Sequence, residues 1–446
     1  MPGLRARPGA RGPGGLRGGL RGGLRDGLRG GPAGGAAGRA RGWMAAHRWA
    51  AGPTLVSTLA SAIAAATTLV IARGAGAAAF GQFTVVLTVA LIVTVGMLFS
   101  LHYVMLQELP RAEPERRPAL LATALLATLA VSAALAGLGM LAAPLLTAAL
   151  NVDTATLAAG LALAFSMTVN QLAESFLRGL KRFALVAWLK LAIAACYLGA
   201  ACFCLLVLGV REAGPYLAAL VVTNLLFAAV AVVAAGVRPR AFSARLAGTL
   251  YRHGGWVSAI AALTGVLFGV DVIFLNHWAA PADVGVYSVY NGFPKRLMGV
   301  VFTDGIGLAL LPLMATSDKP LLMRRIARLA PVVAVVTAVF SFAASTVFFL
   351  LMRGAYPYST ELMALSALGI GVHTAFNLYS VALSMDGVRG AKVLAGCLLA
   401  GTPPALAVLA ACVRWQGLTG GLVGFALANL VLLAVVGTTA ARRYRS

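Results

Sequence analysis

The sequence predicts an all-α integral membrane protein with twelve transmembrane helices in two six-helix lobes related by an axis along the membrane normal. Three observations predict this class. Hydrophobic residues make up 60% of the 446 residues and charged residues only 11%, whereas soluble domains are about 25% charged. The apolar residues gather in twelve segments that are long enough to cross a bilayer. Finally, short motifs recur at a nearly constant offset between the two halves of the chain.

The first 43 residues have a different composition from the rest. They consist mainly of Gly, Arg, Ala and Pro, which cannot bury a core, so residues 1–43 are predicted to be a disordered cytoplasmic tail. An Arg-Gly tail can bind RNA, but a lipid anchor, or sequence upstream of a true start at Met44, explains it more simply. The predicted N-terminal lobe spans 44–240, the C-terminal lobe 250–441, and a basic cytoplasmic tail 442–446.

Each apolar segment is predicted to be a helix, because segments of this length and close spacing do not suit membrane strands. The predicted helices are Pro53–Ala72, Phe83–Met105, Ala119–Ala142, Thr156–Leu177, Phe183–Val210, Tyr216–Val237, Gly255–Trp278, Val284–Met314, Ile326–Met352, Leu362–Met385, Val393–Val413 and Leu418–Ala440.

Lysine and arginine in the loops predict the orientation of these helices. With the N-terminus inside, the inner loops and C-terminal tail hold 19 basic residues and the outer loops 4, as the positive-inside rule requires. Both termini are therefore expected in the cytoplasm. The composition suggests a bacterium, so the expected location is the bacterial cytoplasmic membrane, spanned many times. The asymmetry also accounts for the net charge of +23, so nucleic acid is not an expected partner.

Weak internal similarities suggest a repeat of six helices. Phe80-Gly81 comes before the second predicted helix, and Val284-Gly285 opens the eighth, at an offset of 204 residues; Asn224 and Asn429 occupy similar contexts at an offset of 205. A six-helix repeat gives both halves the same orientation, with a cavity between them. The alternative is coincidence between helices rich in Ala and Leu.

The eighth predicted helix carries charges near its middle. Lys295 and Arg296 are adjacent, Asp304 lies two turns further on, and Pro294, which precedes the pair, is expected to kink or break the helix. A charge at the bilayer centre costs about 2.5–3.5 kcal/mol, so such residues usually face protein or a water-filled cavity. Two interpretations remain open: cations that contact an anionic substrate, or Arg296 and Asp304 neutralising each other or neighbouring helices.

Further polar residues lie in neighbouring helices. Asp271 of the seventh helix is within reach of Lys295 or Arg296 if helices seven and eight form a hairpin. It is a candidate counter-ion, a proton or sodium carrier, or a charge partner only. His373 and Asn377 share a face of helix ten, where they would bind sugar hydroxyls in a cavity or form hydrogen bonds between helices.

The first half holds one similar group. Glu174 of helix four is predicted to pair with Lys190 of helix five, and the alternative partner is Arg178, one turn away.

Enzymatic and metal chemistry find no support in the sequence. The five cysteines lie in apolar segments without His or Asp at ligand spacing, so neither a metal site nor a cofactor is predicted. No nucleophile signature or phosphate-binding glycine loop is present, and the outer loops are too short to present catalytic groups as a membrane glycosyltransferase would. The protein is therefore expected not to be an enzyme.

Three stretches resemble a known family. IARGAGAAAFGQFTVV (71–86), LRGLKRF (177–183) and GVDVIFLNHWAAPADVGVYSVY (269–290) are similar, in order and position, to motifs of polysaccharide transporters. These are the O-antigen-type flippases of lipid-linked oligosaccharides, in the superfamily that includes multidrug and toxin extrusion proteins. The residues Gly292-Phe293-Pro294 before the basic pair depart from the family pattern.

The resemblance implies a V-shaped transporter that works by alternating access. Its implied cargo is a polyprenyl-pyrophosphate-linked oligosaccharide, carried from the inner to the outer leaflet for surface polysaccharide synthesis, with Arg296 and the adjacent Lys295 at the pyrophosphate. The implied partners are membrane lipids and a glycan polymerase or glycosyltransferases. The alternative is ion-coupled efflux of drugs or small molecules. Efflux of cations would favour a carboxylate in the first lobe, and helices one and two contain none.

Overall fold

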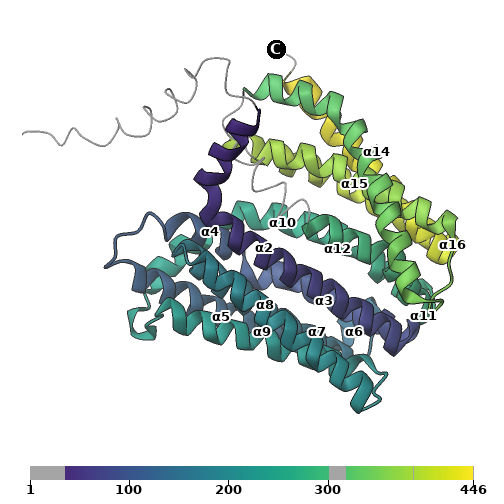
Figure 1. Ribbon diagram of the computed structural model, residues 1–446, viewed down its shortest axis with the longest axis horizontal. Helices are drawn as coiled ribbons and strands as arrows, with labels where there is room; N and C mark the ends of the chain where they lie inside the picture. The colour runs from purple at the N-terminus through teal and green to yellow at the C-terminus, as the bar shows by residue number, and fades with distance from the viewer. Residues whose placement is uncertain (1–35, 301–317, 385, 445–446) are drawn as a thin grey trace, which may run out of the picture. The chain divides into compact units, whose positions relative to one another are not determined.

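The computed structural model describes residues 36–300, 318–384 and 386–444, which are nearly all helical (Figure 1). Residues 1–55 and 56–446 form two separate compact units, and the contacts below all lie in the second. The α-helices are α2 Ala36–Ala75, α3 Ala77–Leu98, α4 Leu101–Glu108, α5 Arg117–Leu141, α6 Ala143–Leu150, α7 Thr154–Gly179, α8 Phe183–Cys202, α9 Ala213–Ala235, α10 Ala244–Trp278, α11 Pro281–Tyr287, α12 Phe293–Val300, α14 Lys319–Met352, α15 Thr360–Ser384 and α16 Gly387–Arg443.

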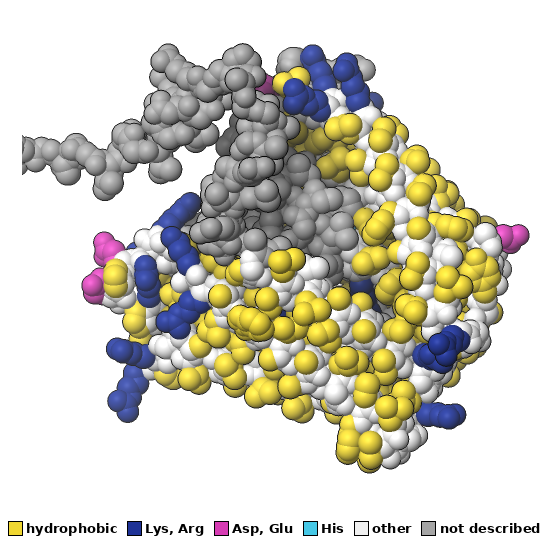
Figure 2. Space-filling model, in the orientation of Figure 1, with side chains coloured by type: hydrophobic (Ala, Val, Ile, Leu, Met, Phe, Trp, Pro, Cys, Tyr) yellow, Lys and Arg dark blue, Asp and Glu magenta, His cyan; other side chains and the backbone are white. Residues whose placement is uncertain are grey.

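Ten helices of the described residues are long and apolar enough to cross a membrane. The last of them, α16, contains two predicted spans, which meet at Gly417, where the backbone leaves the helical conformation (φ 54°, ψ −124°). Large apolar side chains cover the visible face of the helices, while Lys and Arg gather toward helix ends (Figure 2). Leu141 and Trp415, for example, are 81% and 82% exposed. Such a surface suits lipid, and the chain is a multi-pass membrane protein.

Several predicted boundaries were wrong. The predicted helix Phe83–Met105 is two helices, because Phe99 and Ser100 adopt left-handed backbone angles (φ 47° and 53°) that end α3 and begin α4. Helix α2 begins at Ala36, inside the tail for which disorder was predicted. Boundaries of this kind depend on local backbone geometry, which an apolar run does not encode.

The eighth predicted helix does not break at Pro294, which was one of the two forms of the expectation; the other form, a kink, stays a prediction. Helix α11 leads into a π-helical turn, η3 (Ser288–Gly292), and then into α12. In an α-helix the amide of residue 294 would donate to the carbonyl of Tyr290, and proline has no such amide. The hydroxyl of Ser366 in α15 donates to that carbonyl instead, at 2.7 Å. The remainder of this predicted helix lies outside the described residues.

The starts of α3 and α11 pack against each other through glycine (Figure 1). A Cβ atom on Gly81 would lie 2.2 Å from the carbonyl oxygen of Pro281, and one on Gly285 would lie 1.9 Å from that of Ala77. Each glycine therefore approaches the residue four positions before the other, so the contact is reciprocal. This is the relationship expected between equivalent positions of a repeat with an offset of 204 residues. Only residues without a Cβ allow the two backbones to come so close.

Two further contacts join the halves at the helix ends predicted to face outward. The side-chain amide of Asn151, after α6, donates to the carbonyl of Asn276 at 2.8 Å. The Asn276 amide donates back to the carbonyls of Leu150 and Asn151, each at 2.9 Å. Tyr356, between α14 and α15, donates to the carbonyl of Ala72 at 2.8 Å. The halves are thus connected by direct backbone contacts and hydrogen bonds at this end.

Candidate functional site

The centre of the site is an ion pair between Asp271 of α10 and Lys295 of α12. The ammonium of Lys295 bonds to Oδ2 of Asp271, and the two side chains are 5% and 0% exposed. This is the contact predicted for a hairpin of helices seven and eight. Two charges that neutralise each other are far less costly in a membrane interior than either charge alone.

Two neutral groups complete the surroundings of the Asp271 carboxylate. The hydroxyl of Tyr287 donates to Oδ2 at 2.5 Å, and the amide of Asn291 donates to the same oxygen at 3.2 Å. The Asn291 amide also donates to the Tyr287 hydroxyl, at 2.6 Å. The second carboxylate oxygen, Oδ1, is buried and has no hydrogen-bond partner. Oδ2 of Asp271 therefore accepts hydrogen bonds from Lys295, Tyr287 and Asn291, and Oδ1 accepts none.

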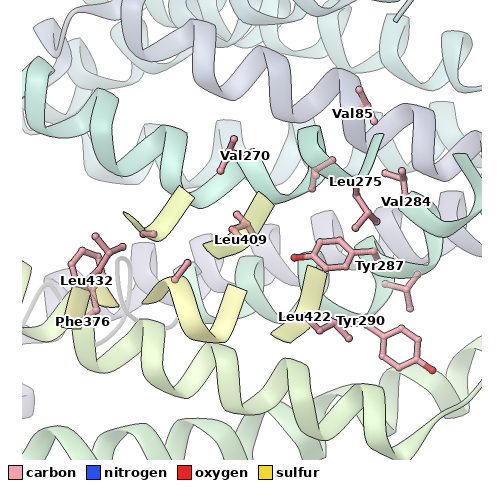
Figure 3. Close-up of a cluster of buried hydrophobic side chains, with 14 of the residues drawn as sticks. Val85, Val270, Leu275, Val284, Tyr287, Tyr290, Phe376, Leu409, Leu422 and Leu432 are labelled. Atoms are coloured by element: carbon pink, nitrogen blue, oxygen red, sulfur yellow. The ribbon is translucent and has the colours of Figure 1, made fainter. Parts of the chain in front are cut away.

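Packing fixes the position of Tyr287. Its ring lies near Leu275 of α10 and Leu422 of α16 (Figure 3). A Cβ on Gly421 would lie 3.0 Å from the Tyr287 ring and 2.8 Å from a methyl of Leu275. The glycine thus leaves room for the ring, and the ring in turn holds the hydroxyl against the carboxylate.

Lys295 makes further contacts on the side away from Asp271. Its ammonium donates to the carbonyl of Phe268 at 3.2 Å. It also lies 4.0 Å from the ring centroid of Phe425 and 5.2 Å from that of Phe268. Aromatic faces attract cations, more strongly where water is excluded. These contacts hold the ammonium in place on the wall of a cavity.

This cavity has a volume of about 360 Å³ and lies among α10, α12, α15 and α16. That size is within the range of small-molecule sites. Its wall is mostly apolar and includes Leu267, Phe268, Met298 and Ile370. Its polar lining residues are Lys295, His373, Asn377 and Asn429, together with the hydroxyl residues Thr264 and Thr374.

His373 and Asn377 lie at the cavity as predicted, but they also hydrogen-bond. Nδ1 of His373 lies 2.7 Å from Oδ1 of Asn429, and Nε2 lies 2.9 Å from the amide nitrogen of Asn377. This network assigns a neutral imidazole with its proton on Nδ1. Both ring nitrogens are occupied, so the predicted inter-helix hydrogen bond is present, and His373 has no free nitrogen for a sugar. The carbonyl oxygen of Asn377 remains available.

Arg296 points in a different direction from Lys295, because successive helical residues are about 100° apart. It is half-buried and forms no ion pair or hydrogen bond with any residue in the described part of the chain. Its charge acts on the hydroxyl of Tyr197 in α8. That hydroxyl is buried without a hydrogen-bond partner. Arg296 is therefore within electrostatic range of the first half, while Lys295 pairs with Asp271 in the second.

Asp304, the third charge predicted for this site, lies outside the described residues, so its pairing with Arg296 remains a prediction.

The structure contains both of the partners that were predicted for Glu174 in the first half. Glu174 accepts from Lys190 at 2.8 Å and from Arg178 at 2.5 Å.

The sequence interpretation missed some residues of the site. Tyr287, Asn291 and Lys295 follow one another at intervals of four, so a polar stripe along helix eight was visible before the structure was known. No comparable signal marks Phe425, whose ring meets Lys295, or Tyr197, which is opposite Arg296. Each is an ordinary aromatic residue in an apolar helix.

Comparison with known proteins gives matches in structure alone. No protein-family model and no curated protein matches the sequence. Among solved structures, an inward-facing multidrug resistance MATE family transporter of the MOP superfamily is 16% identical, with a TM-score of 0.62 over 88% of this chain and 94% of that one. The lipid II flippase MurJ, in an inward closed conformation, is 10% identical, with a TM-score of 0.60 over 88% and 87%.

A third similar structure is a MOP superfamily transporter from Pyrococcus furiosus, described as having a binding pocket of reverse polarity that suggests a different function. It is 16% identical, with a TM-score of 0.57 over 88% of this chain and 94% of that one. These neighbours are described as transporters and a flippase. The chain has the fold of the MOP-superfamily transporters, which confirms the predicted all-α membrane fold class, although the described residues contain ten candidate spans where twelve were predicted.

Proposed function

We propose that the protein is a flippase that moves a polyprenyl-diphosphate-linked oligosaccharide from the inner to the outer leaflet by alternating access. The observation that supports this most strongly is the charge balance of the membrane interior. In the described spans the carboxylates of Glu174 and Asp271 are both paired with lysine, whereas Arg296 has no ion-pair partner there. Among the described residues, the uncompensated charge is therefore positive, which suits an anionic head group.

The same balance disfavours a cationic drug as the substrate. A cation needs an available carboxylate; of the carboxylates in the described spans, Glu174 and Asp271 are already neutralised, and Glu361 lies exposed at the very start of α15. An oxyanion, by contrast, gains charge-assisted hydrogen bonds from a guanidinium, whose planar donors match phosphate geometry. Arg296 is therefore proposed to contact the diphosphate. The oligosaccharide would occupy the space between the halves while the lipid tail stays in the bilayer.

Solved structures of this fold include both a multidrug transporter and a lipid II flippase, so the fold alone does not select the cargo. One neighbour is described by the reversed polarity of its pocket. Polarity is therefore a reasonable criterion for function within the fold, and here it favours an anion.

The test follows a labelled polyprenyl-diphosphate oligosaccharide between leaflets of proteoliposomes containing the wild-type protein or Arg296→Gln. Loss of one charge-assisted contact costs about 1.5–3 kcal/mol, so transfer is expected to fall about 10- to 100-fold. Arg414→Gln, at an exposed arginine in α16, is the matched control and should transfer at the wild-type rate. Equal transfer by the two variants would exclude Arg296 as the head-group contact, and no transfer by folded wild type would exclude the function.

A further inference from the structure

The second half contains a buried ion pair with one unused carboxylate oxygen beside a cavity. From this we infer that Asp271 and Lys295 form an exchange site, in which a phosphate-type oxyanion takes the ammonium of Lys295 and a proton binds Asp271 in its place. The inference rests on the proposed function, since it requires an anionic cargo. It adds a second anion contact to Arg296 and a coupling of transport to protons.

An anion in the cavity has direct access to Lys295. Lys295 lines the 360 Å³ cavity, and Asp271 does not. An anion in the cavity therefore meets the ammonium before it meets the carboxylate that would repel it. The lysine is long and flexible, and its other contacts are one backbone carbonyl and two aromatic faces. Within the described residues, Asp271 is the one anionic group that it would have to leave.

The Asp271 carboxylate loses its counter-ion when Lys295 turns to the anion. Asp271 is 0% exposed, and without Lys295 it would keep only the neutral donors Tyr287 and Asn291. A buried carboxylate without a counter-ion is more costly than a neutral carboxylic acid, so the group takes up a proton. Oδ1 can receive that proton without losing any contact, because it has no hydrogen-bond partner in the ion-paired state.

The exchange is balanced in charge and atoms. The Lys295–Asp271 ion pair, a phosphate-type oxyanion and one proton from water become an ammonium–phosphate ion pair and a neutral Asp271 carboxylic acid. No covalent bond other than the new O–H bond forms or breaks. The proton reaches Asp271 from the cavity side once the ammonium no longer lies between the carboxylate and the cavity.

In the described part of the chain, the other groups around the pair do not supply this proton. Both nitrogens of His373 in α15 are engaged. Tyr287 already donates its hydroxyl proton to Asp271. Arg296 is directed toward α8, α16 presents Phe425 and Asn429, and α3 contains no titratable side chain. Asp271 is therefore the group whose protonation state changes with binding.

Uptake of one proton makes binding depend on pH. By linkage, the affinity for the anion falls about tenfold for each unit of rising pH while Asp271 is ionised in the free protein. Asp271→Asn removes both the competing charge and the proton, so this variant should bind the anion at least as tightly as the wild type and with less dependence on pH. Asp271→Glu keeps a titratable carboxylate and should restore proton uptake.

The experiment is calorimetric titration of the detergent-solubilised full chain with farnesyl diphosphate, in two buffers of different ionisation enthalpy. The wild type is expected to take up one proton more per bound probe than Asp271→Asn, a comparison that subtracts protonation of the probe itself. Infrared difference spectra of the wild type alone should show a new carboxylic acid carbonyl band on binding, so the test does not depend on the folding of a variant.

The outcomes separate the two proposals. Binding without extra proton uptake and without the carboxylic acid band would overturn the exchange site and leave the proposed flippase standing. No binding of the probe by folded wild type would overturn the anion site on which both depend.

Discussion

Replacing Lys295 by methionine tests whether the Asp271–Lys295 pair is mutually compensating. The substitution keeps the length of the side chain and removes its charge, so that Asp271, which is 0% exposed, loses its counter-ion. Removing one partner of a buried ion pair costs about 3–5 kcal/mol. Tyr287 and Asn291 still donate to the carboxylate, so we expect a cost near the lower end, about 3 kcal/mol.

The double variant Lys295→Met/Asp271→Asn supplies the comparison. It removes both charges together, and replacing a whole buried pair is often neutral, so its free energy of unfolding should lie within about 1 kcal/mol of the wild type. The two substitutions are thus expected to be strongly non-additive, as they are for residues in direct contact.

The assay is thermal unfolding of the purified protein in detergent at one fixed scan rate, because membrane proteins of this size often unfold irreversibly. At about 2 °C per kcal/mol for a large chain, Lys295→Met should lower the apparent Tm by about 6 °C, with most of this recovered in the double variant. Single variants within about 1 °C of the wild type, or a double variant as unstable as the sum of the singles, would refute this reasoning.

Three other predictions follow from local contacts. Ser366→Ala removes the hydroxyl that donates to the carbonyl of Tyr290 and should cost about 1–3 kcal/mol in unfolding free energy. The cost should be smaller in the Pro294→Ala background, because residue 294 then has an amide that can donate to the same carbonyl. Equal costs in the two backgrounds would contradict the role of Ser366 as a substitute donor. Gly285→Val should weaken the contact between the halves, because its Cβ meets a carbonyl oxygen at 1.9 Å, whereas Gly199→Val in open space should not; cysteine cross-linking across the contact measures the difference. Burial and a hydrogen bond to the Asp386 carboxylate raise the pKa of Tyr444 to about 12. The contribution of this tyrosine to the free energy of unfolding is therefore present below pH ~10 and is lost as pH rises through 12. Ultraviolet titration of the wild type against Tyr444→Phe checks the midpoint.

Much of the fold was predictable from composition alone. Apolar runs located the spans, because only helices of about 20 residues satisfy the backbone inside a bilayer. Depth along neighbouring helices was enough to predict the pair Glu174–Lys190, since a hairpin brings residues equally far from its turn to one level, and a hairpin of helices seven and eight placed Asp271 within reach of Lys295 or Arg296. These predictions depend on short-range chain geometry, which the sequence encodes directly.

The different contacts of Lys295 and Arg296 were not predictable from the sequence. Sequence reasoning placed Lys295 and Arg296 together at the substrate, but Lys295 pairs with Asp271, whereas Arg296 has no ion-pair partner among the described residues. In the π-helical turn before them, the carbonyl of Tyr290 accepts from the hydroxyl of Ser366, more than 70 residues away in sequence, and no local pattern reveals a contact of this kind. The glycine contact at Gly285 was visible only as a weak repeat, and its meaning required the packing of α3 on α11.

The charge of the head group is the most direct test of the proposed flippase. In one preparation of proteoliposomes we would compare three labelled compounds: a polyprenyl-diphosphate oligosaccharide, the same polyprenol and sugar joined without phosphate, and a cationic dye. The account predicts transfer of the diphosphate compound alone, since Arg296 supplies an uncompensated positive charge in the described part of the membrane interior. Export of the dye, or equal transfer of the lipid without phosphate, would contradict an anion-selective site and favour efflux by the same fold.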